Sequence, residues 1–186
     1  MNLFINAISK NAHLILFDDK RNISDKFSFE IKGNESSLLL PKIHKFLEKN
    51  KLNYLNLKNL VVVNGPWSFT GVRTIVLVAN SIAFTTPCNI TSIGYFQLFS
   101  DYPIVKTSSK RDSFFQKNSF SPIEILQNWD IQNYLKENNI SIVYGEADIN
   151  TIQFIEKIDY SAIIKRVIFQ KNKKIDPLYI KKPNIC

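Results

Sequence analysis

The segment Val61-Val62-Val63-Asn64-Gly65-Pro66-Trp67-Ser68-Phe69-Thr70-Gly71-Val72-Arg73 organises the N-terminal half of the chain. A β-branched run meets a Gly-Pro turn, and a long apolar segment begins after the second glycine. We expect a buried strand, a sharp turn and the start of a buried helix. The chain has only five glycines, and two of them bracket this turn, so the backbone there is expected to need glycine.

The composition is that of a globular protein with a basic end. The 186 residues are 45% hydrophobic and 12% aromatic, which is enough for a core in one domain or in two small lobes. The net charge is +8, but residues 160–186 hold seven Lys or Arg and one Asp (+6), which leaves 17 basic and 15 acidic residues (+2) in residues 1–159. The body is therefore nearly neutral and the C-terminal end is basic.

Cysteine usage and hydropathy predict a cytoplasmic protein. Cys88 and Cys186 are too few for a disulfide framework. The first residues lack the pattern of a signal peptide. The longest apolar stretch, residues 72–84, contains Arg73 and Asn80 and is too short to span a bilayer. We expect no association with a membrane.

The N-terminal part is predicted to combine a strand meander with two helices. Residues 3–5 and 14–17 are apolar runs, and residues 27–31 alternate apolar with polar, which predicts three strands. A first helix is expected to start near Ser37, so that Pro41 falls in its early part, and to extend to Leu47. The strand at 61–63 and a helix at 70–84 follow.

A second, smaller lobe is expected after Asp101-Tyr102-Pro103. Strands are predicted at 104–106, 113–116 and 140–144, and helices at 122–137, 149–157 and 161–169. Strands followed by helices predict an α/β or α+β class. We place the N-terminal lobe at residues 1–101 and a shortened C-terminal lobe, with the basic tail, at residues 102–186.

Both helices of the first lobe are apolar on more than one side. On the 70–84 helix, the apolar face extends sideways through Leu77, Val78 and Phe84. On the earlier helix, Leu38 and Leu40 point in a different direction from the residues that form the main apolar stripe. Either both helices are buried within their own chain, or they also present a surface to a partner. The residues alone leave these alternatives open.

The residue pattern offers no apparatus for metal or nucleophilic chemistry. The two histidines, His13 and His44, lie far apart, and no His-x-x-x-His or Cys-x-x-Cys spacing occurs. Cys88 has no histidine placed to activate it. We therefore predict no catalytic residue, no metal site and no cofactor.

The glycine-bracketed turn is also a poor nucleotide site. It lacks the Gly-Lys-Ser/Thr of a P-loop. The hydroxyls of Ser68 and Thr70 at a helix N-terminus would suit an anion, but the indole of Trp67 is expected to block the close approach of a phosphate to the backbone. We expect no bound nucleotide.

Three segments resemble one family. Residues 65–73, Gly-Pro-Trp-Ser-Phe-Thr-Gly-Val-Arg, resemble the GPGSFTGxR signature of the bacterial TsaB (YeaZ) proteins. Residues 35–43 resemble the H/S-E-x-L-L-P-x-I helix that precedes that signature, and residues 177–181 resemble the closing P-x-Y-L-R. The resemblance covers residues 1–100 and is thin afterwards. Trp67 stands where the family has glycine, and residues 6–9 stand where it has Asp-Thr-Ser.

The resemblance implies an α/β fold of the ASKHA type (actin, Hsp70 and sugar kinases, RNase H-like) with two lobes, the second reduced. TsaB is the non-catalytic partner of the TsaD enzyme, and with TsaE they place the threonylcarbamoyl group on the adenosine next to the tRNA anticodon. By this resemblance the chain would be a scaffold or activator in the synthesis of N6-threonylcarbamoyladenosine (t6A). It would form a heterodimer with a TsaD-type enzyme, join a TsaE-type ATPase in a larger complex and meet tRNA indirectly.

The resemblance also implies site residues, because TsaB pairs with TsaD through the equivalent two helices. The implied partner-binding residues are Leu39, Ile43, His44, Leu47, Val72, Arg73, Val76, Ala79, Asn80 and Ala83. The motif turn that aims the second helix consists of Gly65, Pro66, Trp67, Ser68, Phe69, Thr70 and Gly71. Without its partner, the chain is expected to form a homodimer through the same helices.

Three alternatives stay open. The basic tail is either a solvated surface or an edge that contacts tRNA phosphates; the residues concerned are Lys171, Lys173, Lys174 and Lys181. The chain could instead be a degenerate ASKHA enzyme that binds a nucleotide or a peptide. It could also be a tRNA-binding accessory module.

Overall fold

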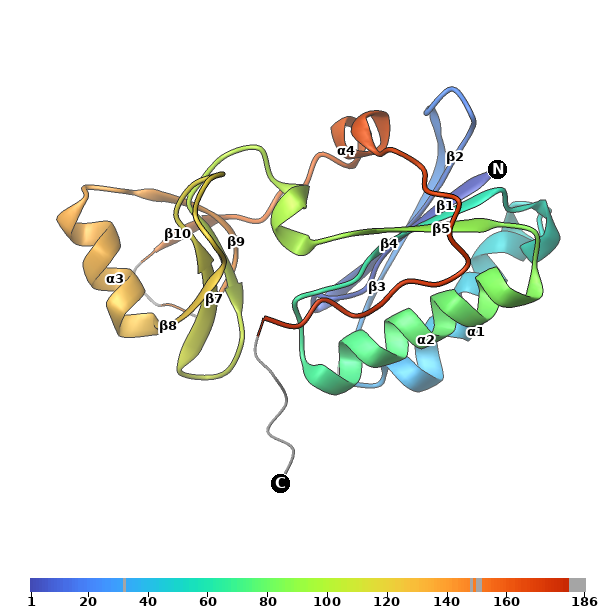
Figure 1. Cartoon of the computed structure of the whole chain (residues 1–186). Helices are drawn as coiled ribbons and strands as arrows, with labels where there is room; N and C mark the ends of the chain where they lie inside the picture. Colours follow the sequence, from blue (N-terminus) through green and yellow to red (C-terminus); the bar gives the residue numbers. More distant parts are fainter. Residues whose placement is uncertain (32, 148, 150–151, 181–186) are drawn as a thin grey trace. The chain divides into compact units, whose positions relative to one another are not determined.

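A computed structural model describes residues 1–31, 33–147, 149 and 152–180. The chain forms two compact units (Figure 1). The first consists of Met1–Tyr95 and Tyr160–Leu178, and the second consists of Phe96–Asp159 with the residues after Leu178. Residues 96–159 of the second unit are therefore inserted into the sequence of the first.

The first unit is built on a mixed five-stranded sheet with the order β3-β2-β1-β4-β5. The strands are β1 (Asn2–Asn6), β2 (Asn11–Phe17), β3 (Ile23–Glu30), β4 (Asn59–Val63) and β5 (Asn89–Ile93). The meander β1-β2-β3 is antiparallel, whereas β1, β4 and β5 are parallel. The central strand β1 is buried along its whole length, which fits the apolar run of its sequence.

Two helices lie side by side on one face of this sheet (Figure 1): α1 (Glu35–Lys49) and α2 (Phe69–Thr85). A short 3-10 turn, η1 (Tyr54–Asn56), lies between α1 and β4. A third helix, α4 (Tyr160–Arg166), returns the chain to the first unit. In the part of the chain that the structure describes, no helix is long and apolar enough to cross a membrane.

The second unit has its own five-stranded sheet, with the order β10-β9-β6-β7-β8. Its elements are η2 (Tyr95–Leu98) at its entrance, β6 (Ile104–Thr107), β7 (Asp112–Gln116), β8 (Glu124–Gln127), α3 (Asn128–Glu137), β9 (Ile142–Glu146) and β10 (Gln153–Ile155). Its core is apolar and joins α3 to one sheet face; its buried members are Val105, Phe115, Ile131, Leu135, Val143 and Ile149.

Two helix predictions in the second unit are wrong. Residues 124–127, predicted as helical, form β8 because they pair with β7, where Phe114 lies opposite Ile125. The helix therefore begins only at Asn128. Residues 153–155 form β10 beside β9 instead of a helix, and residues 150–151 of that prediction lie outside the described residues. Short apolar runs fit both the helical and the strand period. In these two segments, pairing with a neighbouring strand determines that the residues form a strand.

The division into units also differs from the predicted lobes at 1–101 and 102–186. Residues 160–178 belong to the first unit. We call residues 167–178, which follow α4, the C-terminal strap. Its backbone bridges to the edge strand β5, where the Ile90 amide donates to the Asn172 carbonyl at 2.9 Å. The edge of a sheet offers unpaired backbone groups, and the strap supplies partners for them.

Lys106 on β6 is fully buried, and its ammonium donates to the carboxylate of Glu146 on the adjacent strand β9. Burial lowers the pKa of Lys106 from 10.5 to about 8, against the opposing attraction of Glu146. Between these two pH values the unfolded chain holds more protons than the folded chain, so the contribution of Lys106 to stability rises with pH.

We predict that Lys106→Met removes this pH dependence. The free energy of unfolding of the variant, minus that of the wild type, should fall by about 2 to 3 kcal/mol from pH 7 to pH 10. Urea denaturation across that range measures it, with the exposed Lys165→Met as a control whose difference stays flat. A difference for Lys106→Met that does not change with pH would contradict the prediction.

Candidate functional site

The motif turn is shaped by its contact with the C-terminal strap. Gly65 has a φ of 130°, a conformation that favours glycine. A Cβ at this position would lie 2.6 Å from the carbonyl oxygen of Leu178. The Leu178 amide in turn donates to the Asn64 carbonyl at 2.8 Å. Glycine is therefore required both by the backbone angle and by the close approach of the strap.

The second glycine of the motif makes room for the Trp67 side chain. A Cβ on Gly71 would lie 2.7 Å from the indole Cδ1 and 2.7 Å from the hydroxyl of Ser68. Ser68 is the N-cap of α2, and its hydroxyl accepts from the Gly71 amide at 3.1 Å. The Ser68 hydroxyl, which the sequence suggested as a group that would suit an anion, is exposed but already accepts a hydrogen bond that caps the helix.

Most of the helix residues implied as partner-binding are buried inside the first unit. Their apolar spacing points them at the sheet and at the space between the helices. Each is at most 4% exposed: Leu39, Ile43, Leu47, Val72, Val76, Ala79 and Ala83. Of the residues implied, His44 and Arg73 are exposed. His44 lies 3.3 Å from Glu48 one turn along α1 and stacks on Tyr54.

The side chains that α1 and α2 do present to solvent are other apolar residues. Leu77 is 67% exposed and Phe84 is 86% exposed on α2, and Leu40 is 45% exposed on α1. The signal in the sequence is their spacing, since Leu77 and Phe84 are seven residues apart and share a face that the buried stripe does not use. An outer apolar face of this kind is typical of a docking surface.

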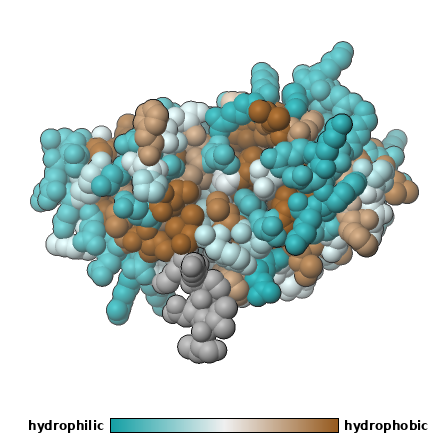
Figure 2. Space-filling view, in the orientation of Figure 1, coloured by the Kyte–Doolittle hydropathy of each residue, from teal (hydrophilic) through white to brown (hydrophobic). Residues whose placement is uncertain are grey.

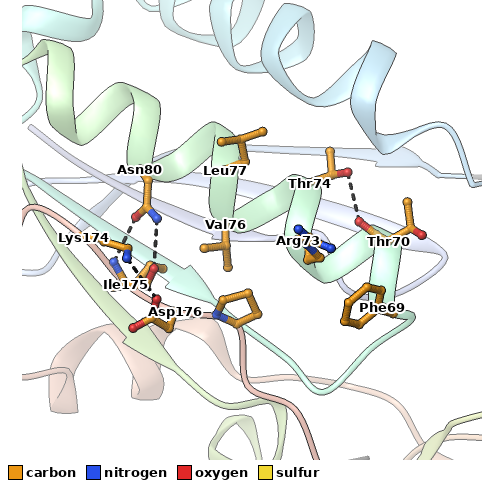
Figure 3. Close-up of a pocket in the computed structure, with 11 residues that line it drawn as sticks. Phe69, Thr70, Arg73, Thr74, Val76, Leu77, Asn80, Lys174, Ile175 and Asp176 are labelled. Carbon is orange, nitrogen blue, oxygen red and sulfur yellow. Dashed lines mark hydrogen bonds and ion pairs between the residues drawn. The ribbon is translucent and has the colours of Figure 1, made fainter. Parts of the chain in front are cut away.

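A groove of about 500 Å³ runs between α2 and the strap (Figure 3). Its α2 side carries Phe69, Arg73 and Leu77, and its strap side carries Lys174 and Asp176. The guanidinium carbon of Arg73 lies 5.0 Å from the centre of the Phe69 ring. Lys174 and Asp176 face each other at 3.5 Å and are both largely exposed.

Asn80 holds the strap against α2. Its side-chain amide donates to the Ile175 carbonyl at 2.9 Å, and its oxygen accepts from the Ile175 amide at 3.0 Å (Figure 3). These two bonds pair the backbone of one strap residue in both directions. The side chain of Asn80, implied above as partner-binding, is therefore used inside the unit.

Lys173 also has an internal role. Its ammonium donates to three carbonyls at and after the C-terminal end of α2, those of Thr86, Pro87 and Cys88, with the Pro87 bond at 2.8 Å. A cation close behind the C-terminal end of a helix interacts favourably with the helix dipole. Of the implied tRNA contacts, Lys173 is thus engaged within the protein.

The other strap lysines are exposed. Lys171 and Lys174 face solvent, and Figure 2 shows mainly hydrophilic residues where the strap crosses the first unit. The fourth implied contact, Lys181, lies outside the described residues.

Asn6, where the family has an aspartate, is buried at the end of β1. Its amide donates to the hydroxyl of Tyr160 on α4 at 2.9 Å. The Tyr160 ring packs edge-on against Phe4 and beside His13, at centroid distances of 5.5 and 5.2 Å. Burial, and secondarily the charge of Lys26, lower the pKa of His13. An aromatic side chain thus fills the space beside Asn6.

The structure assembles no metal centre from the residues it describes: no three His, Cys, Asp or Glu side chains cluster there. Cys88 is buried, and its sulfur lies 3.0 Å from the Thr86 hydroxyl.

The chain has two similar sequences among known proteins of Mycoplasma species. No protein-family model matches the chain. The chain is 26% identical to the uncharacterized protein MG208 of Mycoplasma genitalium, over 97% of this chain and 95% of that protein. It is 25% identical, with the same coverage, to the uncharacterized MG208 homolog of Mycoplasma pneumoniae.

Two solved structures are similar in fold. YeaZ from Pseudomonas aeruginosa aligns with a TM-score of 0.53 and 12% identity, over 68% of this chain and 65% of that chain, which is less than two thirds of its length. An uncharacterized protein with similarity to peptidase YEAZ from Pseudomonas aeruginosa aligns with a TM-score of 0.64 and 10% identity, over 97% of this chain and 100% of that chain. The predicted fold class is confirmed at the level of the fold: the chain has a two-sheet α/β fold similar to that of YeaZ.

We predict that Gly71→Ala destabilises the first unit by about 1 to 3 kcal/mol, because the new methyl group overlaps the Trp67 indole. Urea denaturation gives the loss. In a Trp67→Ala background the same change should be less costly, with a coupling of at least about 0.5 kcal/mol in the double-mutant cycle. Equal losses in both backgrounds would show that Trp67 does not set the requirement for glycine.

We predict that Asn80→Ala lowers the free energy of unfolding by about 2 kcal/mol, since two hydrogen bonds to the strap are lost. Amide hydrogen exchange at Ile175 should accelerate in the same variant. Ser81→Ala, at the exposed neighbouring position on α2, serves as the matched control. A loss of unfolding free energy no larger than that of Ser81→Ala would show that Asn80 does not hold the strap against α2.

Proposed function

We propose that this protein is a non-catalytic subunit of a t6A-synthesising complex, which pairs with a TsaD-type enzyme through the outer face of α1 and α2. The YeaZ-like fold supports this proposal. So do the three segments that resemble the TsaB family, of which the signature turn forms the start of α2. In the proposed complex, a TsaE-type ATPase and the tRNA are bound chiefly by the other subunits.

The observation that carries the proposal is the exposed apolar face of α1 and α2. Leu40, Leu77 and Phe84 are all large apolar side chains exposed on two adjacent helices. Exposure of such residues on neighbouring elements marks a surface that a protein partner covers. A second copy of the chain would cover the same face in the absence of the enzyme, as the predicted homodimer requires.

The packing beside Asn6 and Gly71 weighs against the nucleotide-binding alternative. Tyr160 bonds to Asn6 at one end of the sheet, and Trp67 packs onto Gly71 at the start of α2. A phosphate cradle requires open backbone at such positions. The proposed role therefore assigns no nucleotide to this chain, and the exposed Lys171 and Lys174 remain proposed contacts to tRNA phosphates.

Deletion of the gene, followed by mass-spectrometric measurement of t6A in bulk tRNA, tests the proposal. We expect t6A to fall strongly and to return when the gene is restored. A tagged copy should co-purify with the TsaD-type enzyme of the same organism. Normal t6A in the deletion strain, together with no co-purification, would refute the proposal.

We predict that Leu77→Asp weakens binding to the enzyme at least about tenfold, because a carboxylate would be buried in an apolar contact. Its thermal stability should stay near that of the wild type, since Leu77 is 67% exposed. Calorimetry on the purified pair measures the affinity.

Two variants control this result. Ile168→Asp changes an apolar side chain that is 83% exposed beyond α4, and it should bind like the wild type. Val76→Asp places a charge at a position that is 4% exposed, and it should unfold the unit instead of acting on binding alone. Wild-type affinity for Leu77→Asp would place the docking surface elsewhere.

A further inference from the structure

We propose that the groove between α2 and the C-terminal strap receives an apolar side chain of the partner protein, and that a carboxylate of the same partner segment pairs with Arg73. This inference rests on the proposed function and deepens it, because it names the chemistry of the partner surface. The occupant is thus an acidic, apolar protein segment.

On its α2 side the groove has apolar side chains at its floor and at its rim. Val76, 4% exposed, lies at the floor, while Phe69 and Leu77 stand at the rim with 41% and 67% of their surface exposed. Two polar side chains along the α2 side are already bonded: the Thr74 hydroxyl donates to the Thr70 carbonyl at 3.0 Å, and Asn80 is bonded to Ile175. An apolar side chain would therefore meet matching surface without stripping these groups of partners.

Arg73 supplies the electrostatic argument. It is the only charged residue within Phe69–Thr85, and it is exposed. Among the described residues no carboxylate forms an ion pair with it; its recorded contact is the Phe69 ring. Docking a partner on α2 would remove water from this guanidinium, and an unpaired buried charge is strongly unfavourable. A partner that covers this helix must bring a carboxylate, which the guanidinium can bind with two hydrogen bonds.

A second copy of the chain is the weaker candidate for the groove. Each copy carries a formal charge of +8, so two copies repel, whereas an acidic partner is attracted. Asp176, the carboxylate that lines the groove itself, already lies 3.5 Å from the ammonium of Lys174. Charge complementarity therefore favours a different protein with an acidic surface.

The test measures binding of the full chain to the TsaD-type enzyme of the same organism by calorimetry. Arg73→Leu should weaken binding about 30-fold and Arg73→Glu more than about 100-fold, as expected for one partner of a buried charge pair. Between 50 and 500 mM salt, wild-type affinity should fall more steeply than that of Arg73→Leu. Lys165→Glu, an exposed cation on α4, is the matched control and should bind nearly as tightly as the wild type.

The binding results distinguish failure of this inference from failure of the proposed function and from occupation of the groove by a second copy. If the wild type binds and Arg73→Leu binds within about threefold of it, this inference fails while the proposed function stands. If the wild type does not bind the enzyme at all, both fail. If sedimentation shows that the Arg73 variants lose self-association while they keep their affinity for the enzyme, the groove belongs to a second copy and the inference is overturned. Circular dichroism and melting curves verify that the variants are folded.

Discussion

The first unit depends on the attachment of the C-terminal strap to α2 and to the turn that precedes it. Asn80 pairs both backbone groups of Ile175, and Leu178 bonds to Asn64 beside Gly65. These contacts join residues that are about a hundred positions apart in sequence, and they form one wall of the groove on α2. The shape of the proposed docking surface is therefore set as much by the strap as by the helix.

Much of the first unit could be predicted from local patterns. The β-branched run at Val61–Val63 became β4, and the apolar stripe behind Gly71 became α2, because each pattern was long and its period was unambiguous. The short apolar segments of the second unit fitted both periods, and strand pairing at Ile125 decided for β8. The strap could not be foreseen, because a coil that pairs side chain to backbone has no period.

In the candidate site, too, local patterns could be predicted from the sequence, whereas contacts between distant segments could not. Spacing identified that α2 carries apolar residues, Leu77 and Phe84 among them, beside its main stripe, whereas the family resemblance implied the buried Val76 and Ala79 as partner-binding. The basic tail was correctly seen as a charge excess, yet the carbonyls that Lys173 binds come from residues 86–88. Pairings between distant segments depend on tertiary structure, and the residue pattern of a single sequence does not reveal them.

The two sequence segments of the first unit are separated by residues 96–159, and this separation has a consequence for folding. The ribosome delivers the sheet and α2 first, then residues 96–159 of the second unit, and only afterwards the strap with Lys173. During synthesis the β5 edge and the carbonyls of residues 86–88 must wait for these partners. The strap therefore has to close a loop that contains the whole 96–159 segment, and the entropy cost of closure grows slowly with the length of that loop. Completion of the first unit is thus a late, long-range event, and folding of this kind is slow relative to local helix formation.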